Sequence, residues 1–235
     1  MATAPLATPF DAPSPARPAD PQLAARVRSF ETAFGMQATM PEAFDLSRET
    51  DATLALYGLR RGQTDGFGWQ CLVARRLVER GVRVVELIHT GSSGNWDSHG
   101  NMADHGRLAR EVDRPMAGLV RDLKRAGLFD DVLVVWTTEF GRTPFNNTPQ
   151  NAGREHHSWA FSSWLAGAGV KRGYVHGATD EHGIRAAENP VHVHDLHATI
   201  LHLMGLDHER LTYRHAGRDF RLTDIHGNIV KDILA

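Results

Sequence analysis

The sequence contains a single cysteine, no long apolar run and no signal peptide. Cys71 is the one cysteine among 235 residues, which excludes an intramolecular disulfide, and the helix-like run around it predicts a small buried side chain. No apolar run approaches the ~18–20 residues of a membrane span, and the N-terminus lacks the charged start and apolar core of a signal peptide. We therefore expect no membrane partner and, for the sequence as written, a cytoplasmic location.

The sequence also lacks an excess of charge of either sign. Its 26 basic and 28 acidic side chains give a formal net charge of −2, and Lys and Arg form no stripe interleaved with aromatic residues. Nucleic acid is therefore excluded as an expected partner. With 41% hydrophobic residues, a chain of this length can bury roughly 70–75% of its unfolded surface, which is enough for one ordinary globular core.

The first 20 residues differ from the rest of the chain. Residues 1–20 are mostly Ala and Pro with few large apolar side chains, so we expect a disordered lead-in. Residues 21–235 show no convincing boundary and are expected to form one metal-binding α/β domain. Pro21 suits the first turn of a helix, and apolar side chains then recur at intervals of three and four to about Thr39. The recurring side chains are Leu23, Val27, Phe30 and Phe34.

Two further helices each lead into a short apolar run. An apolar stripe over residues 67–78 is closed by Gly81, and the strand-like run 82–88 follows at once. A second stripe over residues 102–126 leads to a Val-rich run over residues 131–136. This alternation predicts an α/β fold with a mixed, largely parallel central sheet flanked by helices.

Two residues are expected to mark a kink in one helix and the start of another. Pro115 is expected to kink or restart the long helix. Asp195 is expected to cap a last helix that ends at Gly205.

Histidine is the most informative residue type. The chain has 14 histidines, 11 of them after residue 150, and several stand beside carboxylates just past apolar runs. Asp97 and His99 follow the first expected strand, and Glu139 follows the second, so these groups could meet at the carboxyl edge of a sheet. Imidazole and carboxylate are ligands that divalent transition metals prefer. The sequence predicts a metal-assisted hydrolase.

Each of these residues also has a structural explanation. Asp97 and His99 could form an ordinary turn in which Asp97 bonds its own backbone, and Glu139 could merely pair with Arg142. We favour ligation for Asp97 and His99 because of their position, and for Glu139 because a carboxylate at a partly buried rim needs a cation.

The aperiodic segment from Gly141 to Ser158 carries the next candidates, since long loops without periodicity are usually functional or disordered. It ends in His156 and His157, of which one is expected to be a ligand and the other a supporting or surface group, with His157 favoured. Arg142 is the candidate catalytic residue, because a guanidinium can clamp an oxyanion.

The C-terminal histidines leave more alternatives open. One of His192, His194 and His197 is expected to line the site, and His194 is retained as a candidate ligand. Surface or core positions explain these residues equally well, since Asp195 is already accounted for as a helix cap. The remaining histidines, His176, His182, His202, His208, His215 and His226, have no carboxylate at convincing spacing and are expected to be structural or superficial.

Four ordered strings resemble the bacterial family called domain of unknown function 1501. They are Trp96-Asp97-Ser98-His99-Gly100-Asn101, Glu139-Phe140-Gly141-Arg142-Thr143-Pro144, Gly153-Arg154-Glu155-His156-His157 and the stretch from Asn189 to Leu201. The resemblance runs from about Pro21 to Ala235. The family is similar to a branch of the alkaline phosphatase and sulfatase superfamily, which implies a central sheet with a metal site at its carboxyl edge.

The resemblance also implies departures from the superfamily. Glu139 and Phe140 stand where its ligand motif has Asp and His, and the chain resembles only the C-terminal half of family members, whose N-terminal half carries an export signal, a metal-binding acid and the nucleophile. Asp97, His99 and His157 would form one metal subsite and Glu139 part of another. A separate N-terminal half or a homo-oligomer would then be a partner of this chain.

Two hypotheses follow from the sequence. The first is a metal-dependent hydrolase-like domain for phosphate or sulfate esters, with zinc or manganese as the first choice of ion and calcium or magnesium as the second. The second is a non-catalytic metal-binding or scaffold module that retains the fold.

Overall fold

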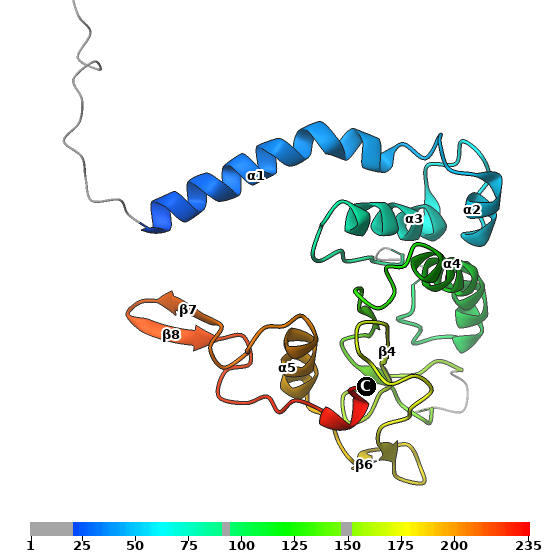
Figure 1. Ribbon diagram of the computed structural model, residues 1–235. Coiled ribbons are helices and arrows are strands. Elements are labelled where there is room, and N and C mark those ends of the chain that lie inside the picture. Colours follow the sequence, from blue (N-terminus) through cyan, green and yellow to red (C-terminus); the bar gives the residue numbers. More distant parts are fainter. Residues whose placement is uncertain (1–20, 91–94, 147–151) are drawn as a thin grey trace, which may run out of the picture. The chain divides into compact units, whose positions relative to one another are not determined.

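The structure, a computed structural model, describes residues 21–90, 95–146 and 152–235 (Figure 1). The expected disordered lead-in, residues 1–20, lies outside the described residues. The chain divides into two compact units, Met1–Arg48 and Glu49–Ala235. Helices and short antiparallel strand pairs make up the described residues, so the fold is mixed α/β.

Helix α1 spans Pro21–Phe44, 24 residues, and runs five residues past its expected end (Figure 1). Pro41 lies inside it, close to the C-terminal end. The apolar side chains that predicted the helix face solvent, with Phe30 75% and Phe34 76% exposed. Helix propensity and periodicity therefore located α1 correctly, but its stripe is not part of a core.

Three helices form the core of the second unit. They are α2 (Asp51–Leu56), α3 (Gly66–Glu79) and α4 (His105–Arg125), the last preceded by the 3₁₀ turn η1 (Met102–Asp104). Gly118 brings α4 close to the end of α2, because a Cβ at this position would lie 2.6 Å from the carbonyl oxygen of Leu56. Helix α4 runs through Pro115 without a break. The largest fully buried apolar side chains here are Tyr57, Cys71, Leu72, Leu108 and Leu123.

Local sequence explains where α2 and α3 begin and end. The Thr50 hydroxyl accepts a hydrogen bond from the amide of Thr53 at the start of α2. Gly81, with a φ of 85°, follows α3, and the amide of Val82 donates back to the carbonyl of Leu77. This glycine-based termination is the one the sequence predicts.

An ion-pair network joins these helices. Arg75 of α3 lies 2.8 Å from Glu49 and 2.6 Å from Glu79, and its Nε lies 3.1 Å from Asp122 of α4 in ion-pair but not hydrogen-bonding geometry. The Tyr57 hydroxyl donates to Asp122 over 3.0 Å. Because Glu49, Arg75 and Asp122 are only 10–11% exposed, each charge depends on its partners.

The strands are short and their pairs are antiparallel. They are β1 (Val134–Trp136), β2 (Gly141–Arg142), β3 (His156–His157), β4 (Trp164–Ala166), β5 (Ala178–Thr179), β6 (Ala186–Glu188), β7 (Thr212–His215) and β8 (Arg218–Arg221). The pairs are β1–β4, β2–β3, β5–β6 and β7–β8. The largely parallel central sheet predicted from the sequence is not among the described strands, which pair antiparallel. The one parallel bridge among the described residues joins Asn101 and Ala152, which lie outside the strands.

The expected strand over residues 82–88 is not formed in this structure. The segment belongs to no strand pair among the described residues, and Val84 and Ile88 are 71% and 69% exposed. Val85 and Leu87 alternate with them and are half-buried. The residues have the pattern of a strand, but a strand also needs a neighbour to take its backbone hydrogen bonds.

Helix α5 spans Val193–Leu203. His192 is its N-cap, and Asp195, the expected cap, is the third helical residue and accepts from the His192 amide in a capping box. The other oxygen of Asp195 accepts from the amide of Asn228 over 2.7 Å, which ties α5 to the segment that leads to the 3₁₀ turn η2 (Lys231–Ile233).

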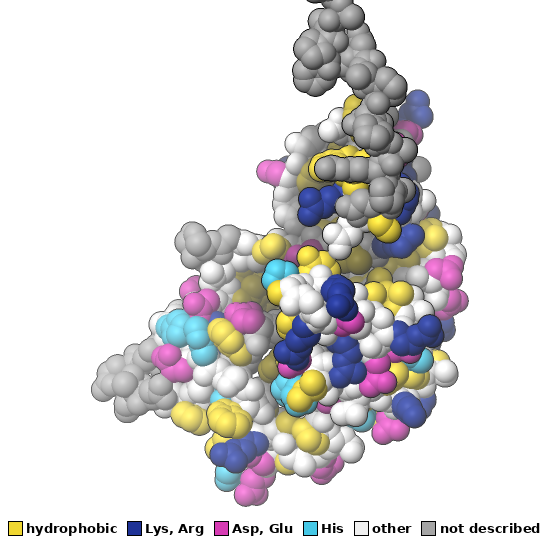
Figure 2. Space-filling model, turned by 90° about the vertical axis from the view of Figure 1, so that its left-hand side faces the viewer, with side chains coloured by type: hydrophobic (Ala, Val, Ile, Leu, Met, Phe, Trp, Pro, Cys, Tyr) yellow, Lys and Arg dark blue, Asp and Glu magenta, His cyan; other side chains and the backbone are white. Residues whose placement is uncertain are grey.

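The charged side chains on the surface in Figure 2 are mixed in sign, as the nearly balanced composition indicates. Figure 2 shows Lys and Arg side chains interspersed with Asp and Glu side chains on the face that it draws, with hydrophobic side chains among them. Among the described helices, none combines the length and apolar character needed to cross a membrane.

Candidate metal centre

Trp96 anchors the loop that carries Asp97 and His99. Its indole donates to His89 over 3.0 Å, and its carbonyl lies 2.8 Å from Nε2 of His105, the first residue of α4. The ring also packs edge-on against Trp136 of β1, with centroids 6.2 Å apart. The loop is therefore held between the segment after α3, the start of α4 and the first strand.

The backbone turn at this loop does not use the Asp97 carboxylate. The Asn95 side chain accepts from the amide of Asp97 over 2.9 Å, so Asn95 supplies the turn that the alternative explanation assigned to Asp97. The carboxylate of Asp97 is left for other partners.

A second segment crosses this loop by main-chain contacts. The amide of Arg154 donates to the carbonyl of Ser98 over 3.1 Å, and the amide of Met102 donates to the carbonyl of Ala152 over 3.3 Å. Gly153 lies between them, and a Cβ there would clash with the carbonyl group of His99. A glycine at this position is what allows the two backbones to approach.

The β2–β3 pair then places His156. Arg142 is directly opposite His156, and Gly141 is opposite His157. The pair lies inside the segment that the sequence indicated as an aperiodic loop.

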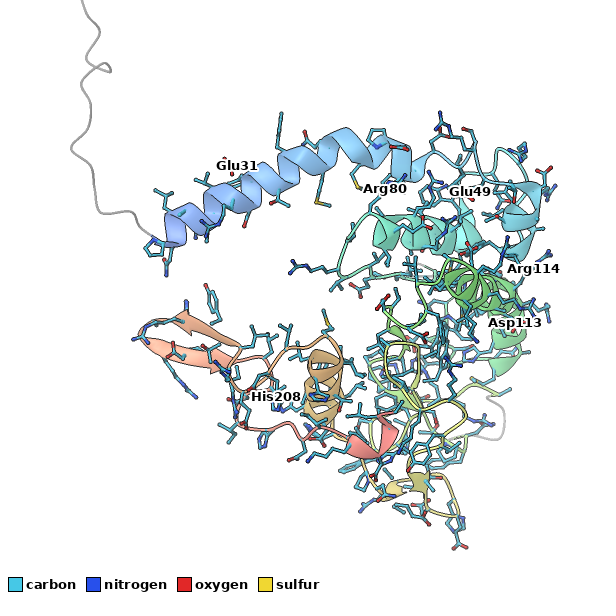
Figure 3. All side chains as sticks on the ribbon, in the orientation of Figure 1. Glu31, Glu49, Arg80, Asp113, Arg114 and His208 are labelled. Atoms are coloured by element: carbon cyan, nitrogen blue, oxygen red, sulfur yellow. The ribbon has the colours of Figure 1, made fainter. Side chains whose placement is uncertain are left out.

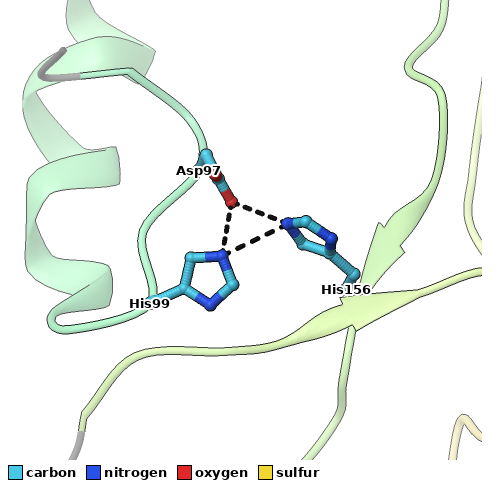
Figure 4. Close-up of side chains that lie close together, drawn as sticks. All are labelled: Asp97, His99 and His156. Atoms are coloured by element: carbon cyan, nitrogen blue, oxygen red, sulfur yellow. Dashed lines mark hydrogen bonds and ion pairs between the residues drawn. The ribbon is translucent and has the colours of Figure 1, made fainter. Parts of the chain in front are cut away.

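Asp97, His99 and His156 converge (Figure 4). His99 Nε2 lies 2.9 Å from Asp97 Oδ1, His156 Nε2 lies 3.0 Å from the same oxygen, and the two ring nitrogens are 3.2 Å apart. The three side chains are 43%, 47% and 50% exposed for His99, Asp97 and His156. Two imidazoles and one carboxylate thus present three donor atoms to one point at the surface.

Arg142 is the third side chain that contacts the Asp97 oxygen. Its guanidinium lies 2.5 Å from Asp97 Oδ1. The hydrogen bonds from Arg142 and from His156 lower the pKa of Asp97 to about 2. The carboxylate is therefore charged at any pH at which the protein is expected to work.

Glu155 supports the other side of His99. Its Oε2 lies 2.9 Å from His99 Nδ1, so a proton on Nδ1 would be donated to the carboxylate and the Nε2 lone pair would face Asp97 and His156. Sequence reasoning did not assign Glu155 a role. Its place beside His156, in a string that already contained the candidate ligands, was the available signal.

The comparisons with known proteins place the chain in a family. The family model described as protein of unknown function (DUF1501) matches residues 5–234. The chain belongs to the DUF1501 family. No curated protein and no solved structure matches it.

In this DUF1501 protein the histidine at the centre is His156, whereas the sequence favoured His157. His157 is 6% exposed, and its Nε2 donates to the carbonyl of Ile184 over 2.7 Å. Consecutive residues of a strand point to opposite faces. His156 accordingly faces Asp97, and His157 faces the interior.

Glu139 lies near the centre but outside the group of three. Its own backbone amide and the Thr138 hydroxyl, 2.7 Å away, lower its pKa by hydrogen bonding, and the charges of Arg142 and His156 lower it further. Glu139 is thus within electrostatic reach of the centre and already bonded within its own turn.

His194 is not brought to the centre. It lies beside His192 and His226, with ring centroids 4.9 and 5.5 Å away. Its Nδ1 is buried without a hydrogen-bond partner among the described residues. The structure therefore places Asp97, His99, His156 and Arg142 together, Glu139 beside them, and His157 and His194 elsewhere.

Proposed function

We propose that this DUF1501 protein binds one divalent metal ion at Asp97, His99 and His156 and serves in the hydrolysis of phosphate or sulfate esters. The observation that carries the proposal is the spacing of the three donor atoms, 2.9, 3.0 and 3.2 Å. With metal–ligand bonds of about 2.0–2.1 Å, neighbouring donors are about 2.9 Å apart in an octahedral site and about 3.3 Å apart in a tetrahedral one. The donor set fits such an ion in chemistry and in spacing.

The donor types favour particular ions. Two imidazole nitrogens and one carboxylate suit zinc or manganese, whereas calcium and magnesium prefer an all-oxygen set. We therefore propose zinc or manganese first, and calcium or magnesium second.

The residues around the donors have separate roles in this proposal. Glu155 orients His99, and Arg142 offers a guanidinium that can bind a phosphate or sulfate oxygen. A bound divalent ion would supply Lewis-acid activation of an ester oxygen or of a water molecule. Glu139 would belong to a second, incomplete subsite, as expected if the family is related to the alkaline phosphatases and sulfatases and if a separate N-terminal half completes the site and its central sheet.

One observation favours the alternative, a metal-binding module without catalysis. The donor side chains are about half exposed, and cavities of about 520 and 240 Å³ lie elsewhere, beside Phe129 and beside Arg114. Electrostatic catalysis is strongest where water is excluded. Metal binding without turnover would support this second candidate.

Metal content tests the site. Protein purified without a histidine tag is expected to bind about one zinc or manganese ion per chain. His156→Ala and Asp97→Asn should lower the affinity at least tenfold, since loss of an outer-shell partner alone typically costs 10–100-fold. Elemental analysis after equilibrium dialysis measures both.

Two matched variants provide the controls. His157→Ala removes the neighbouring histidine, and His202→Ala removes an exposed histidine of α5. Both should keep the metal affinity of the unsubstituted chain when occupancy is normalised to folded protein. Equal metal content in His156→Ala and the unsubstituted chain would refute the assignment.

A further inference from the structure

Helix α1 carries an apolar stripe that the described residues of its own unit leave exposed. Leu23, Val27, Phe30 and Phe34 are 59%, 46%, 75% and 76% exposed. Their spacing of four, three and four residues puts them on one side of the helix. Amphipathic helices normally bury such a stripe against another element, and the described residues of its own unit offer α1 no such element.

The stripe follows a heptad pattern. Leu23 and Phe30 occupy d positions and Val27 and Phe34 occupy a positions. The pattern ends there, because the next two positions in register are Gln37 and Pro41. The apolar seam therefore covers residues 23–34.

The charges beside the seam indicate what can cover it. Arg26 occupies position g, and Glu31, labelled in Figure 3, occupies position e of the next heptad. Both side chains are exposed. In a parallel pair of helices, g of one helix lies beside the e position five residues further along its partner, so Arg26 of each copy would meet Glu31 of the other. An antiparallel pair would instead set g against g and e against e.

We propose that a second copy of this chain packs on α1, forming a parallel two-stranded coiled coil over residues 23–34. Two symmetric Arg26–Glu31 pairs fix its direction. The inference does not depend on the metal centre, which lies in the other unit. Because the seam is only about two heptads long, we expect a weak dimer. The dimer should therefore be populated only at higher protein concentration.

Charge exchange in the full-length chain tests this arrangement. Arg26→Glu alone sets Glu against Glu31, and Glu31→Arg alone sets Arg against Arg26, so each variant should have a dimer dissociation constant about tenfold higher. An equimolar mixture of the two variants restores both opposite-charge pairs in the mixed dimer. Sedimentation velocity across a concentration series should show dimer recovered in the mixture only.

Further variants separate the seam from general charge effects. Arg28→Glu changes an exposed residue at position b, away from the seam, and should dimerise as the unsubstituted chain does. Phe30→Ala should abolish dimerisation while circular dichroism shows the second unit still folded. A monomer at every concentration, or a mixture no more dimeric than its components, would overturn the proposal. Single variants that dimerise as well as the unsubstituted chain would also overturn it and would point to an antiparallel pair, because that arrangement already sets like charges together in the unsubstituted chain.

Discussion

Asp97 Oδ1 accepts from Arg142 and lies beside both imidazoles of the centre. Its pKa of about 2 lies below the ordinary Asp value of about 3.9. The folded state therefore binds fewer protons here than the unfolded state between about pH 4 and pH 2. The stabilisation from Asp97 is complete above about pH 4 and is lost as the pH falls through about 2.

Arg142 should be the main cause of this low pKa. In metal-free protein, Arg142→Gln is expected to raise the pKa of Asp97 towards its ordinary value, because the largest hydrogen-bond contribution is lost. Carbon-13 NMR titration of the Asp97 carboxyl group measures this pKa. Arg107→Gln, which removes the partner of Glu111 on α4, should leave the Asp97 titration unchanged. An unaltered midpoint in Arg142→Gln would mean that the guanidinium is not bound to Asp97 in solution.

At this scale the sequence predicted residue types better than residue positions. Asp97, His99 and Arg142 were predicted and lie together, although the strand expected before Asp97 and His99 is not formed. The choice between His156 and His157 depended on which face of β3 points outward, and that face is set by the pairing of His157 with Gly141 rather than by local composition. The contact of Glu155 with His99 likewise could be predicted only from the three-dimensional arrangement.

At the scale of the elements, Arg75 joins α3 to α4 and to Glu49, which lies two residues before α2. Arg75→Met should lower the free energy of unfolding by about 3–5 kcal/mol, because it leaves Glu49 and Asp122 as buried carboxylates without this partner. Urea denaturation measures the change. Glu79→Gln, which removes a 32% exposed partner of the same arginine, should cost at most about 1 kcal/mol.

The reactivity of the Cys71 thiol, on the same helix, provides an independent test of the prediction for Arg75. Burial raises the pKa of its thiol to about 12, so a thiol reagent should modify it only when α3 opens. Modification should be faster in Arg75→Met than in Glu79→Gln. Equal stability and equal thiol reactivity in the two variants would show that Arg75 is not the joint between the helices.

The four longer helices were predicted closely, helix α2 was not predicted, and the predicted central sheet is not among the described strands. Periodicity, Pro21 and Gly81 are local signals, and they located α1 and α3 to within a few residues except at the end of α1. Residues 82–88 have equally clear strand character, but whether they form a strand depends on a neighbour elsewhere in the chain or outside it. The two-residue strands β2 and β3 are too short for any period to show.

For the whole molecule, we predict that the chain alone hydrolyses aryl phosphate and sulfate esters very slowly or undetectably, even with zinc or manganese supplied. The nearby hydroxyls are already engaged: that of Ser98 donates to the Asn101 carbonyl, and that of Thr138 donates to Glu139. Neither of these two hydroxyls is therefore placed as an activated nucleophile. Colorimetric release of an aryl leaving group measures turnover.

The counterpart of this prediction concerns a separate N-terminal half. If, as proposed, a separate N-terminal half completes the site, adding that half in trans should raise the rate, and Asp97→Ala should remove the gain. Fast metal-dependent turnover by this chain alone, abolished by Asp97→Ala, would show instead that water is a sufficient nucleophile at the exposed site.

Gly153 has a consequence for the energetics of ion capture. The crossing that it permits, with its bonds to Ser98 and Met102 at either side, is made of main-chain groups and needs no cation. The donors are consequently arranged without an ion, so binding of the proposed ion would order little of the chain. Unlike a zinc finger, which folds only on its metal, this centre would lose and regain its ion as an ordinary exchange reaction, with the fold around it intact.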